Sequence, residues 1–250
     1  MTQSDFSGFD IDDSRAQKTL DAIQAFVEEF KYRQEAGELR RLLDGERLNG
    51  GILEQAPEDF TEHELVQPCL HALGYSDPQQ SDVSASDPQL RRQPAKFPKV
   101  EQKRPDYELR NVHDQLTCIV EVKAINRERV TQPGKATENI ETYLDNNTFC
   151  KHARGDPPGV LVGIGTDGFR WFLWLKDLDT GTIHENIIRE SIIGPVKKIA
   201  TNELPEMTSD QEARQTRIQV RDELKTHLVT SFSRENVVRQ VGTEITRITS

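Results

Sequence analysis

Apolar residues recur at helical spacing near the start of the chain. Four of them follow one another at intervals of three, four and three residues: Leu20, Ile23, Val27 and Phe30. This spacing places the four side chains on one face of a helix, which we predict over residues 14–48, before two consecutive glycines. The acidic residues 1–13 lack such a pattern and are predicted to be disordered.

A second helical pattern covers residues 59–75, which read DFTEHELVQPCLHALGY. Thr61 stands three residues before Glu64, which is the spacing of a capping box, so we predict that Thr61 caps this helix. Pro68 falls inside the pattern and is predicted to kink the helix, because proline lacks the backbone N–H. Residues 76–104 are rich in Ser, Asp, Gln and Pro and are predicted to form a loop.

The middle of the chain carries short apolar runs that are typical of strands. Residues 106–110 and 117–124 are two such runs joined by a polar gap. The segment 159–177 reads GVLVGIGTDGFRWFLWLKD and predicts two further strands, because Asp-Gly between apolar runs is a strong hairpin signal. Between these pairs, residues 135–147 predict a helix, and residues 206–250 are predicted to be mostly helical.

This order of elements predicts an α/β or α+β fold in which helices flank a central mixed sheet. We divide the chain into an acidic N-terminal segment and helix at 1–55, a core at 56–178 and a C-terminal helical extension at 179–250. The sequence contains no internal repeat and no Walker-type phosphate-binding loop.

The composition indicates where in the cell the protein is found. No apolar run approaches the roughly 20 residues of a membrane helix, and the acidic N-terminus does not resemble a signal peptide. We therefore predict a cytoplasmic protein without a membrane contact. The cysteines Cys69, Cys118 and Cys150 are odd in number and far apart, which indicates neither a disulfide framework nor a zinc site.

The net charge of −10 is unexpected for a protein that binds nucleic acid. It reflects either a salty cytoplasm or a segregation of charge. The segment LRRQPAKFPKVEQKR at 90–104 supports segregation, because its only acid is Glu101 and it holds six basic residues: Arg91, Arg92, Lys96, Lys99, Lys103 and Arg104. We predict that nucleic acid approaches along this segment. An alternative path crosses Arg127, Arg129 and Lys135.

One predicted strand carries charged residues in an otherwise apolar run. Side chains alternate along a strand, so Glu121 and Lys123 share a face with Ile119. If the preceding turn is centred on residues 113–114, Asp106 lies directly opposite Glu121 on the same face. A register shift of one residue would separate the two carboxylates.

Two carboxylates at this separation repel each other unless a cation lies between them. Mg²⁺ favours one or two carboxylates together with water and a substrate phosphate. Such an ion lowers the pKa of bound water and stabilises charge on a phosphate, and Lys123 would orient the attacking water or help to deprotonate it. The competing interpretation is a cross-strand salt bridge, because Glu-x-Lys also occurs at Glu29, Glu101 and Glu223.

The stretch RPDYEL followed by IVEVKA resembles the PD-(D/E)XK nuclease superfamily, and most of all the N-terminal nuclease domain of type I restriction enzyme R subunits. TEHELVQPCLHALGY is similar to the first helix of that family, and GVLVGIGTDGFRWFLW is similar to its late hairpin. The resemblance covers residues 60–177. It implies a restriction-endonuclease-like core and an endonuclease that hydrolyses DNA phosphodiester bonds with Mg²⁺ or Mn²⁺, in restriction or anti-phage defence.

The resemblance also implies roles for individual residues. Asp106 and Glu121 would be metal ligands, the Val122 carbonyl would complete the metal shell, and Lys123 would serve the nucleophilic water. All three charged residues are therefore predicted to be catalytic.

The acid that the family carries on its first helix could be Glu62 or Glu64. Helical spacing places Glu62 on the apolar face and Glu64 on the outer face, so we predict that Glu62 is a catalytic metal ligand. The family's Gln-x-x-x-Tyr motif corresponds to NIETY here, with Asn139 in place of Gln and Tyr143 retained. These two residues are candidates for DNA contact.

DNA is the expected substrate, with RNA as an alternative. The resemblance suggests a helicase or ATPase partner, a methyltransferase partner or further domains, and we expect a homo-oligomer. The competing function is a nucleic-acid-binding or assembly module built on a catalytically weak nuclease fold.

Overall fold

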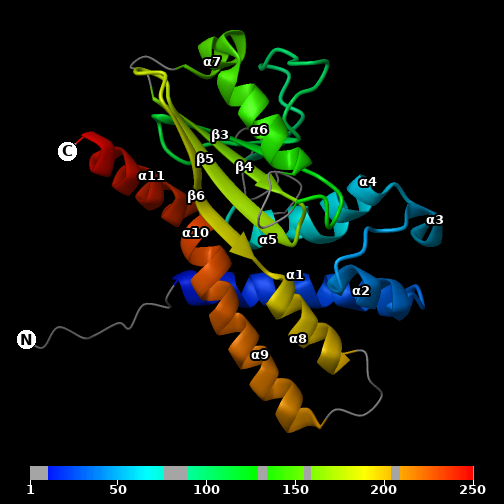
Figure 1. Cartoon of the computed structure of the whole chain (residues 1–250). Helices are drawn as coiled ribbons and strands as arrows, with labels where there is room; N and C mark the ends of the chain where they lie inside the picture. The colour runs from blue at the N-terminus through cyan, green and yellow to red at the C-terminus, as the bar shows by residue number, and fades with distance from the viewer. Residues whose placement is uncertain (1–10, 76–88, 129–133, 155–158, 204–208, 250) are drawn as a thin grey trace, which may run out of the picture.

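The structure is a computed structural model that describes residues 11–75, 89–128, 134–154, 159–203 and 209–249. These residues form a mixed α/β fold in which a six-stranded sheet is flanked by helices (Figure 1). The predicted class of fold, a mixed sheet between helices, is therefore confirmed. No helix in the described part of the chain is long and apolar enough to cross a membrane.

The strands follow one another at short intervals in the central part of the chain. They are β1 (Leu90–Arg92), β2 (Tyr107–Leu109), β3 (Leu116–Val122), β4 (Val160–Thr166), β5 (Arg170–Asp177) and β6 (Ile183–Ser191). Their order in the sheet is the same as their order in the sequence. Neighbouring strands are antiparallel except β3 and β4, which are parallel.

The helices precede, interrupt and follow the sheet. Before it lie α1 (Ile11–Tyr32), α2 (Ala36–Leu43), α3 (Gly50–Leu53), α4 (Pro57–Thr61), a π-helical turn (Glu62–Val66) and α5 (Gln67–Ala72). The crossover from β3 to β4 contains α6 (Lys135–Asp145) and α7 (Asn147–Ala153). After the sheet lie α8 (Ile193–Glu203), α9 (Asp210–Leu224), a second π-helical turn (Lys225–Val229), α10 (Thr230–Phe232) and α11 (Arg234–Thr249).

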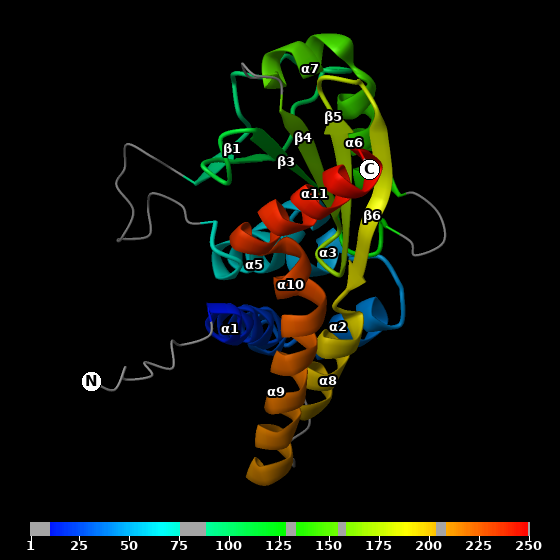
Figure 2. The ribbon, with the colours of Figure 1, turned by 90° about the vertical axis from the view of Figure 1, so that its left-hand side faces the viewer.

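Two apolar cores lie on the two faces of the sheet. On one face, Ile119 and Leu161 pack against Ile140 of α6 and Phe149 of α7. The other face is covered by α1, α5 and the C-terminal helices, as Figures 1 and 2 show. Side chains from all three predicted segments meet in this larger core, including Phe26, Val120 and Val237.

The N-terminal helix differs from its prediction. Residues 11–13 are helical rather than disordered, and residues 1–10 lie outside the described part of the chain. The helix predicted over 14–48 is divided, because Gln34 has a φ of 60°. This left-handed conformation commonly ends a helix, and α2 then runs in a new direction (Figure 1).

The start of the next helix also differs. The capping box at Thr61 is absent, because α4 begins at Pro57 with Ala56 as its N-cap. Proline is favoured at the first position of a helix, where its missing N–H costs no hydrogen bond. The hydroxyl of Thr61 instead donates to the Pro57 carbonyl at 2.9 Å. The turn before Pro68 is π-helical, which is a common distortion next to a proline within a helix.

Two strands were not predicted. β1 lies within the predicted loop 76–104, of which residues 76–88 are outside the described part of the chain. β6 lies within the segment 179–250 that was predicted to be helical. Its pairing with β5 is interrupted by a register shift between Leu173 and Leu175, so the strand lacks a regular alternation of apolar side chains.

Candidate active site

The hairpin of β2 and β3 has the register that the sequence predicts. Tyr107 pairs with Val120, and the same register continues along the strands to Leu109. Extended by one residue, this register brings Asp106 opposite Glu121. The hairpin therefore places both carboxylates on the same side of the sheet, where side chains of directly opposed residues are neighbours.

Asp106 lies immediately before β2 and points toward β3. Its Oδ2 atom accepts a hydrogen bond from the backbone N–H of Val122 at 2.7 Å. Burial and the nearby Glu121 carboxylate raise the pKa of Asp106 to about 7, against the opposing charge of Lys123 and the Val122 hydrogen bond. The side chain is thus fixed on the strand that carries Glu121.

Glu121 is 2% exposed and is held by α6 from above the sheet. Its Oε1 atom accepts a hydrogen bond from Asn139 Nδ2 at 2.6 Å, and its Oε2 atom accepts one from the Tyr143 hydroxyl at 3.4 Å. Both donors were candidates for DNA contact. Tyr143 is only 1% exposed and stacks on Phe149 with ring centroids 5.1 Å apart, and its hydroxyl points to Glu121.

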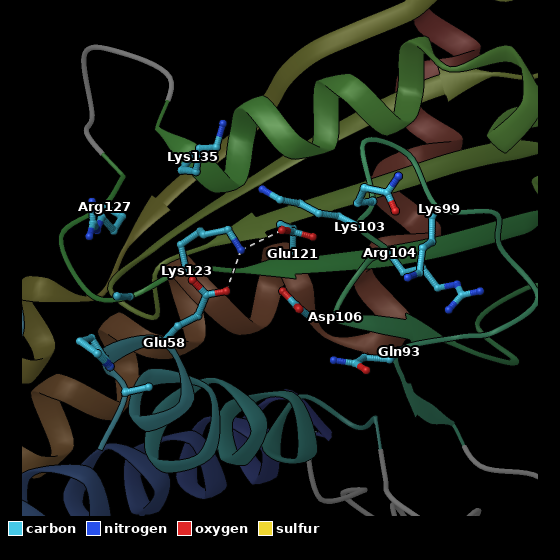
Figure 3. Close-up of a pocket in the computed structure, with 14 residues that line it drawn as sticks. Glu58, Gln93, Lys99, Lys103, Arg104, Asp106, Glu121, Lys123, Arg127 and Lys135 are labelled. Carbon is cyan, nitrogen blue, oxygen red and sulfur yellow. Dashed lines mark hydrogen bonds and ion pairs between the residues drawn. The ribbon is translucent and has the colours of Figure 1, made fainter. Parts of the chain in front are cut away.

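Lys123 closes the cluster at the end of β3. Its Nζ atom lies 2.8 Å from Glu121 Oε1, 2.6 Å from the Val122 carbonyl oxygen and 2.9 Å from Glu58 Oε1 (Figure 3). Burial opposes the charge of Lys123, but Glu121 and Asp106 together raise its pKa above the usual value. The backbone of Lys123 is anchored as well, because its N–H donates to the Thr166 carbonyl on β4 at 2.9 Å.

Glu58 belongs to this cluster although the sequence did not indicate it. It lies in the first turn of α4, and its side chain is 49% exposed. Because Thr61 was taken as the start of the helix, Glu58 was left outside it. The signal that could have found Glu58 is the neighbouring Pro57, whose ring favours the first position of a helix.

Glu62, which the sequence analysis predicts to be a catalytic metal ligand, lies outside the cluster. Its carboxylate accepts a hydrogen bond from the Tyr107 hydroxyl at 2.7 Å and forms an ion pair with Arg92 at 2.9 Å. Glu62 is buried, as the apolar phase of the helix predicts, but its partners come from β1 and β2. Glu64 is partly buried, and that burial and Glu29 raise its pKa.

A pocket of about 720 Å³ opens over the cluster. Asp106, Glu121 and Lys123 line it together with Glu58, whereas Glu62 does not. Figure 3 shows the acidic side chains and Lys123 converging near the centre of this pocket. The rest of the charged lining is basic: Lys99, Lys103, Arg104, Arg127 and Lys135.

The predicted basic segment is only partly directed at the pocket. Arg91 is exposed on β1, and Arg92 is paired with Glu62. Lys96 is paired with Glu108 and lies over the Phe97 ring. Lys99, Lys103 and Arg104 line the pocket, so half of the six predicted contacts are near the cluster. Arg127 and Lys135 from the alternative path reach the same pocket, and Arg129 lies outside the described residues.

The oxygen atoms of the cluster suit a hard divalent cation. The Glu121 carboxylate and the Val122 carbonyl contact the Lys123 ammonium, and the Asp106 carboxylate lies beside them. Mg²⁺ retains several waters and needs only one or two protein carboxylates, whereas zinc sites use more ligands of a softer kind. Within the described part of the chain no group of three His, Cys, Asp or Glu side chains is arranged for a metal ion. A divalent cation at this place would therefore be held by few protein ligands and partly through water.

Comparisons of the chain with protein-family models, with curated proteins and with solved structures find no match. The function is therefore inferred from the chemistry of the pocket and from the motifs in the sequence.

Proposed function

We propose that the chain is a metal-dependent nuclease that hydrolyses phosphodiester bonds of DNA. The observation that supports this best is the convergence of Asp106, Glu121 and Lys123 on one pocket, beside the Val122 carbonyl. The basic side chains around this acidic centre favour a substrate that carries several negative charges.

The residues of the pocket would have different roles in catalysis. Asp106, Glu121 and the Val122 carbonyl would hold the cation. When bound, Mg²⁺ supplies a Lewis acid that lowers the pKa of water and stabilises charge on the phosphate. Lys123 would donate hydrogen bonds to the attacking water or to a phosphate oxygen. Glu58 would position the Lys123 ammonium, since it contacts Nζ at 2.9 Å.

The sequence motifs support a more specific proposal. The resemblance to PD-(D/E)XK nucleases suggests a restriction-endonuclease-like core within residues 56–178 and a role in restriction or anti-phage defence. The order of helix, acidic hairpin, helix and late hairpin along the chain agrees with that resemblance. A cytoplasmic location, self-association and a helicase, ATPase or methyltransferase partner are proposals on the same ground.

Plasmid cleavage tests the proposed function. Purified protein is incubated with supercoiled DNA and Mg²⁺ or Mn²⁺, with EDTA as the metal-free control. We expect nicked or linear products in the presence of metal only. The variants Asp106→Asn, Glu121→Gln and Lys123→Met should each lose activity by at least about 100-fold, because each removes one part of a single unit.

The control variant is Glu141→Gln, which changes an exposed acid on α6 and should cleave normally. Circular dichroism confirms that each variant is folded. Near-normal cleavage by Asp106→Asn would contradict the proposed site. Wild-type protein that binds DNA without cutting it would favour the binding module instead, in which the contacts of Lys123 with Glu58 and Glu121 serve only as ion pairs.

A further inference from the structure

The basic residues of the pocket differ in whether they already have partners. Lys135 pairs with Glu138 at 3.0 Å, and Arg104 donates to the Phe97 carbonyl at 2.9 Å. By contrast, three exposed cations form no side-chain hydrogen bond or ion pair with any described residue: Lys99, Lys103 and Arg127.

Lys99 and Lys103 stand on a rigid turn. Val100 and Lys103 exchange two backbone hydrogen bonds of 2.9 Å across it. The two residues between them, Glu101 and Gln102, have φ values of 50° and 69°. Non-glycine residues are disfavoured in this left-handed region, at a cost on the order of 1 kcal/mol each. Such strain persists only where the surrounding structure fixes the backbone.

The same turn is anchored to α7 by Phe97. This ring is 1% exposed and stacks on Phe149 of α7 with centroids 4.8 Å apart. Arg104 ties the other end of the turn back to the Phe97 carbonyl. The two lysines therefore project from a backbone that does not need to rearrange when a ligand arrives.

Arg127 stands on an equally well-fixed segment on the other side. Its neighbour Asn126 donates from Nδ2 to the Leu42 carbonyl at 2.8 Å and accepts from Arg170 at Oδ1. Its other neighbour, Glu128, is 1% exposed, and its backbone N–H donates to Asp167 at 3.1 Å.

The side chain of Glu128 fixes this segment further. It accepts hydrogen bonds from the Ala136 N–H at 2.5 Å and from the Thr137 hydroxyl at 2.8 Å, at the beginning of α6. Both flanking side chains are thus turned into the protein and bonded, while Arg127 alone faces the pocket. An arginine presented in this way is suited to a phosphate, which its guanidinium can bind through two parallel hydrogen bonds.

The turn that carries Lys99 and Lys103 and the segment that carries Arg127 lie on opposite sides of the acidic centre. Figure 3 shows Arg127 on one side, Lys99 and Lys103 on the other, and Asp106 and Glu121 between them. We infer that these three cations bind the phosphates on either side of the bond that is cut, so that a DNA strand crosses the pocket and does not end in it. The position of the cut rests on the proposed function, whereas the binding of the strand does not.

DNA affinity measured against salt tests this inference. The protein is the Asp106→Asn variant in EDTA, and the probe is a fluorescent DNA duplex followed by anisotropy. Each phosphate contact contributes about 0.9 to the slope of log affinity against log salt. Replacing Lys99, Lys103 and Arg127 with Gln should therefore flatten the slope by about 2 to 3. The lysine pair alone should remove about 2, and Arg127 alone about 1.

The matched control removes three exposed cations outside the pocket lining: Lys18, Lys151 and Arg214, each changed to Gln. It alters the net charge equally and should leave the slope nearly unchanged. An equal loss in both triple variants would mean that only overall charge matters, and an unchanged slope in the pocket variant would place the strand elsewhere. Either result overturns the inference, as does binding confined to RNA.

A second measurement tests whether the strand crosses the pocket. The Asp106→Asn variant should bind a covalently closed DNA circle as tightly as linear DNA of the same sequence. A requirement for a free end would overturn the crossing. If the pocket variant flattens the slope but wild-type protein never cleaves, the inferred DNA binding by the three cations is supported and the nuclease proposal fails. If wild-type protein cleaves and the slope does not change, the nuclease proposal is supported and the inferred binding by the three cations fails.

Discussion

Lys123 Nζ lies 2.9 Å from Glu58 Oε1, although 65 positions separate the two residues in the chain. This contact joins the first turn of α4 to the end of β3. It makes the helix before the sheet a part of the pocket, and it involves a different acid from the one that helical spacing indicates.

Exchanging each of the two acids separates their roles. Glu58→Gln should slow cleavage about 10- to 100-fold, because the Lys123 ammonium loses one of the carboxylates that orient it. Its stability should change little, since the Glu58 side chain is 49% exposed. Steady-state kinetics with a fluorescent DNA substrate and urea unfolding measure the two effects.

Glu62→Gln should do the reverse. Its ion pair with Arg92 and its hydrogen bond with Tyr107 are part of the packing between the π-helical turn and the sheet. We expect the free energy of unfolding to fall by about 1 to 3 kcal/mol, with the folded protein still active. Full stability together with a large loss of activity would return Glu62 to the metal site.

Asn139 should control how well Glu121 binds a cation. Asn139→Ala removes the hydrogen bond of 2.6 Å to Glu121 Oε1. The loss of such a supporting contact commonly weakens metal affinity by about 10- to 100-fold. Calorimetric titration with Mn²⁺ measures the affinity without requiring cleavage. Asn139→Gln, which keeps the amide on a longer side chain, should recover part of it, and an unchanged affinity in Asn139→Ala would contradict the positioning role.

Magnesium should stabilise the folded protein. A ligand that binds only the folded state adds about 2.7 kcal/mol at a concentration 100 times its Kd. Thermal unfolding should therefore shift upward with Mg²⁺, and EDTA should reverse the shift. In Asp106→Asn the shift should be smaller, because one of the two carboxylates no longer carries charge. An equal shift in both proteins would place the bound ion elsewhere.

Asp167 should make stability depend on pH. Burial raises its pKa to about 6, against the opposing charge of Arg170. Because this value lies above that of the unfolded chain, folding favours the protonated form, and stability is lost as the pH rises through about 6. Between pH 4.5 and 7.5 this loss amounts to about 2 kcal/mol.

Asp167→Asn provides the comparison. The variant is less stable at every pH, because its amide cannot accept all of the hydrogen bonds from the backbone of Glu128, Phe169 and Arg170. The difference between wild-type and variant should be larger at pH 4.5 than at pH 7.5, as measured by urea unfolding at both values. A constant difference would show that Asp167 does not titrate in this range.

The hairpin could be predicted because its determinants are local. With the turn centred on residues 113–114, within the polar gap, the alternation of side chains decides which residues are opposed. This register places Asp106 opposite Glu121, whereas their proposed roles come from the resemblance. The strands β4 and β5 were equally accessible, since Asp167 and Gly168 mark the turn between them.

The rest of the pocket depends on contacts that local patterns do not contain. Two helix-start signals compete near Pro57 and Thr61, and taking Thr61 as the start left Glu58 outside the predicted helix. One partner of Glu62, Arg92, comes from β1, a strand of three residues that is too short to give a pattern of its own. Asn139 and Tyr143 belong to a helix that was predicted correctly, but their contact with Glu121 depends on how that helix packs.

The parallel pairing of β3 and β4 determines when the pocket can form during folding. All other neighbouring strands are antiparallel, and their connections are much shorter than the crossover between β3 and β4. The β3–β4 pair must instead wait for the crossover that contains α6 and α7, and closing such a loop carries the larger entropic cost. Two hydrogen bonds depend on this step: the one from the Lys123 N–H to the Thr166 carbonyl and the one from Asn139 to Glu121. A growing chain therefore contains Asp106, Glu121 and Lys123 before it can assemble them into one centre, which requires the crossover to close and β4 to pair with β3.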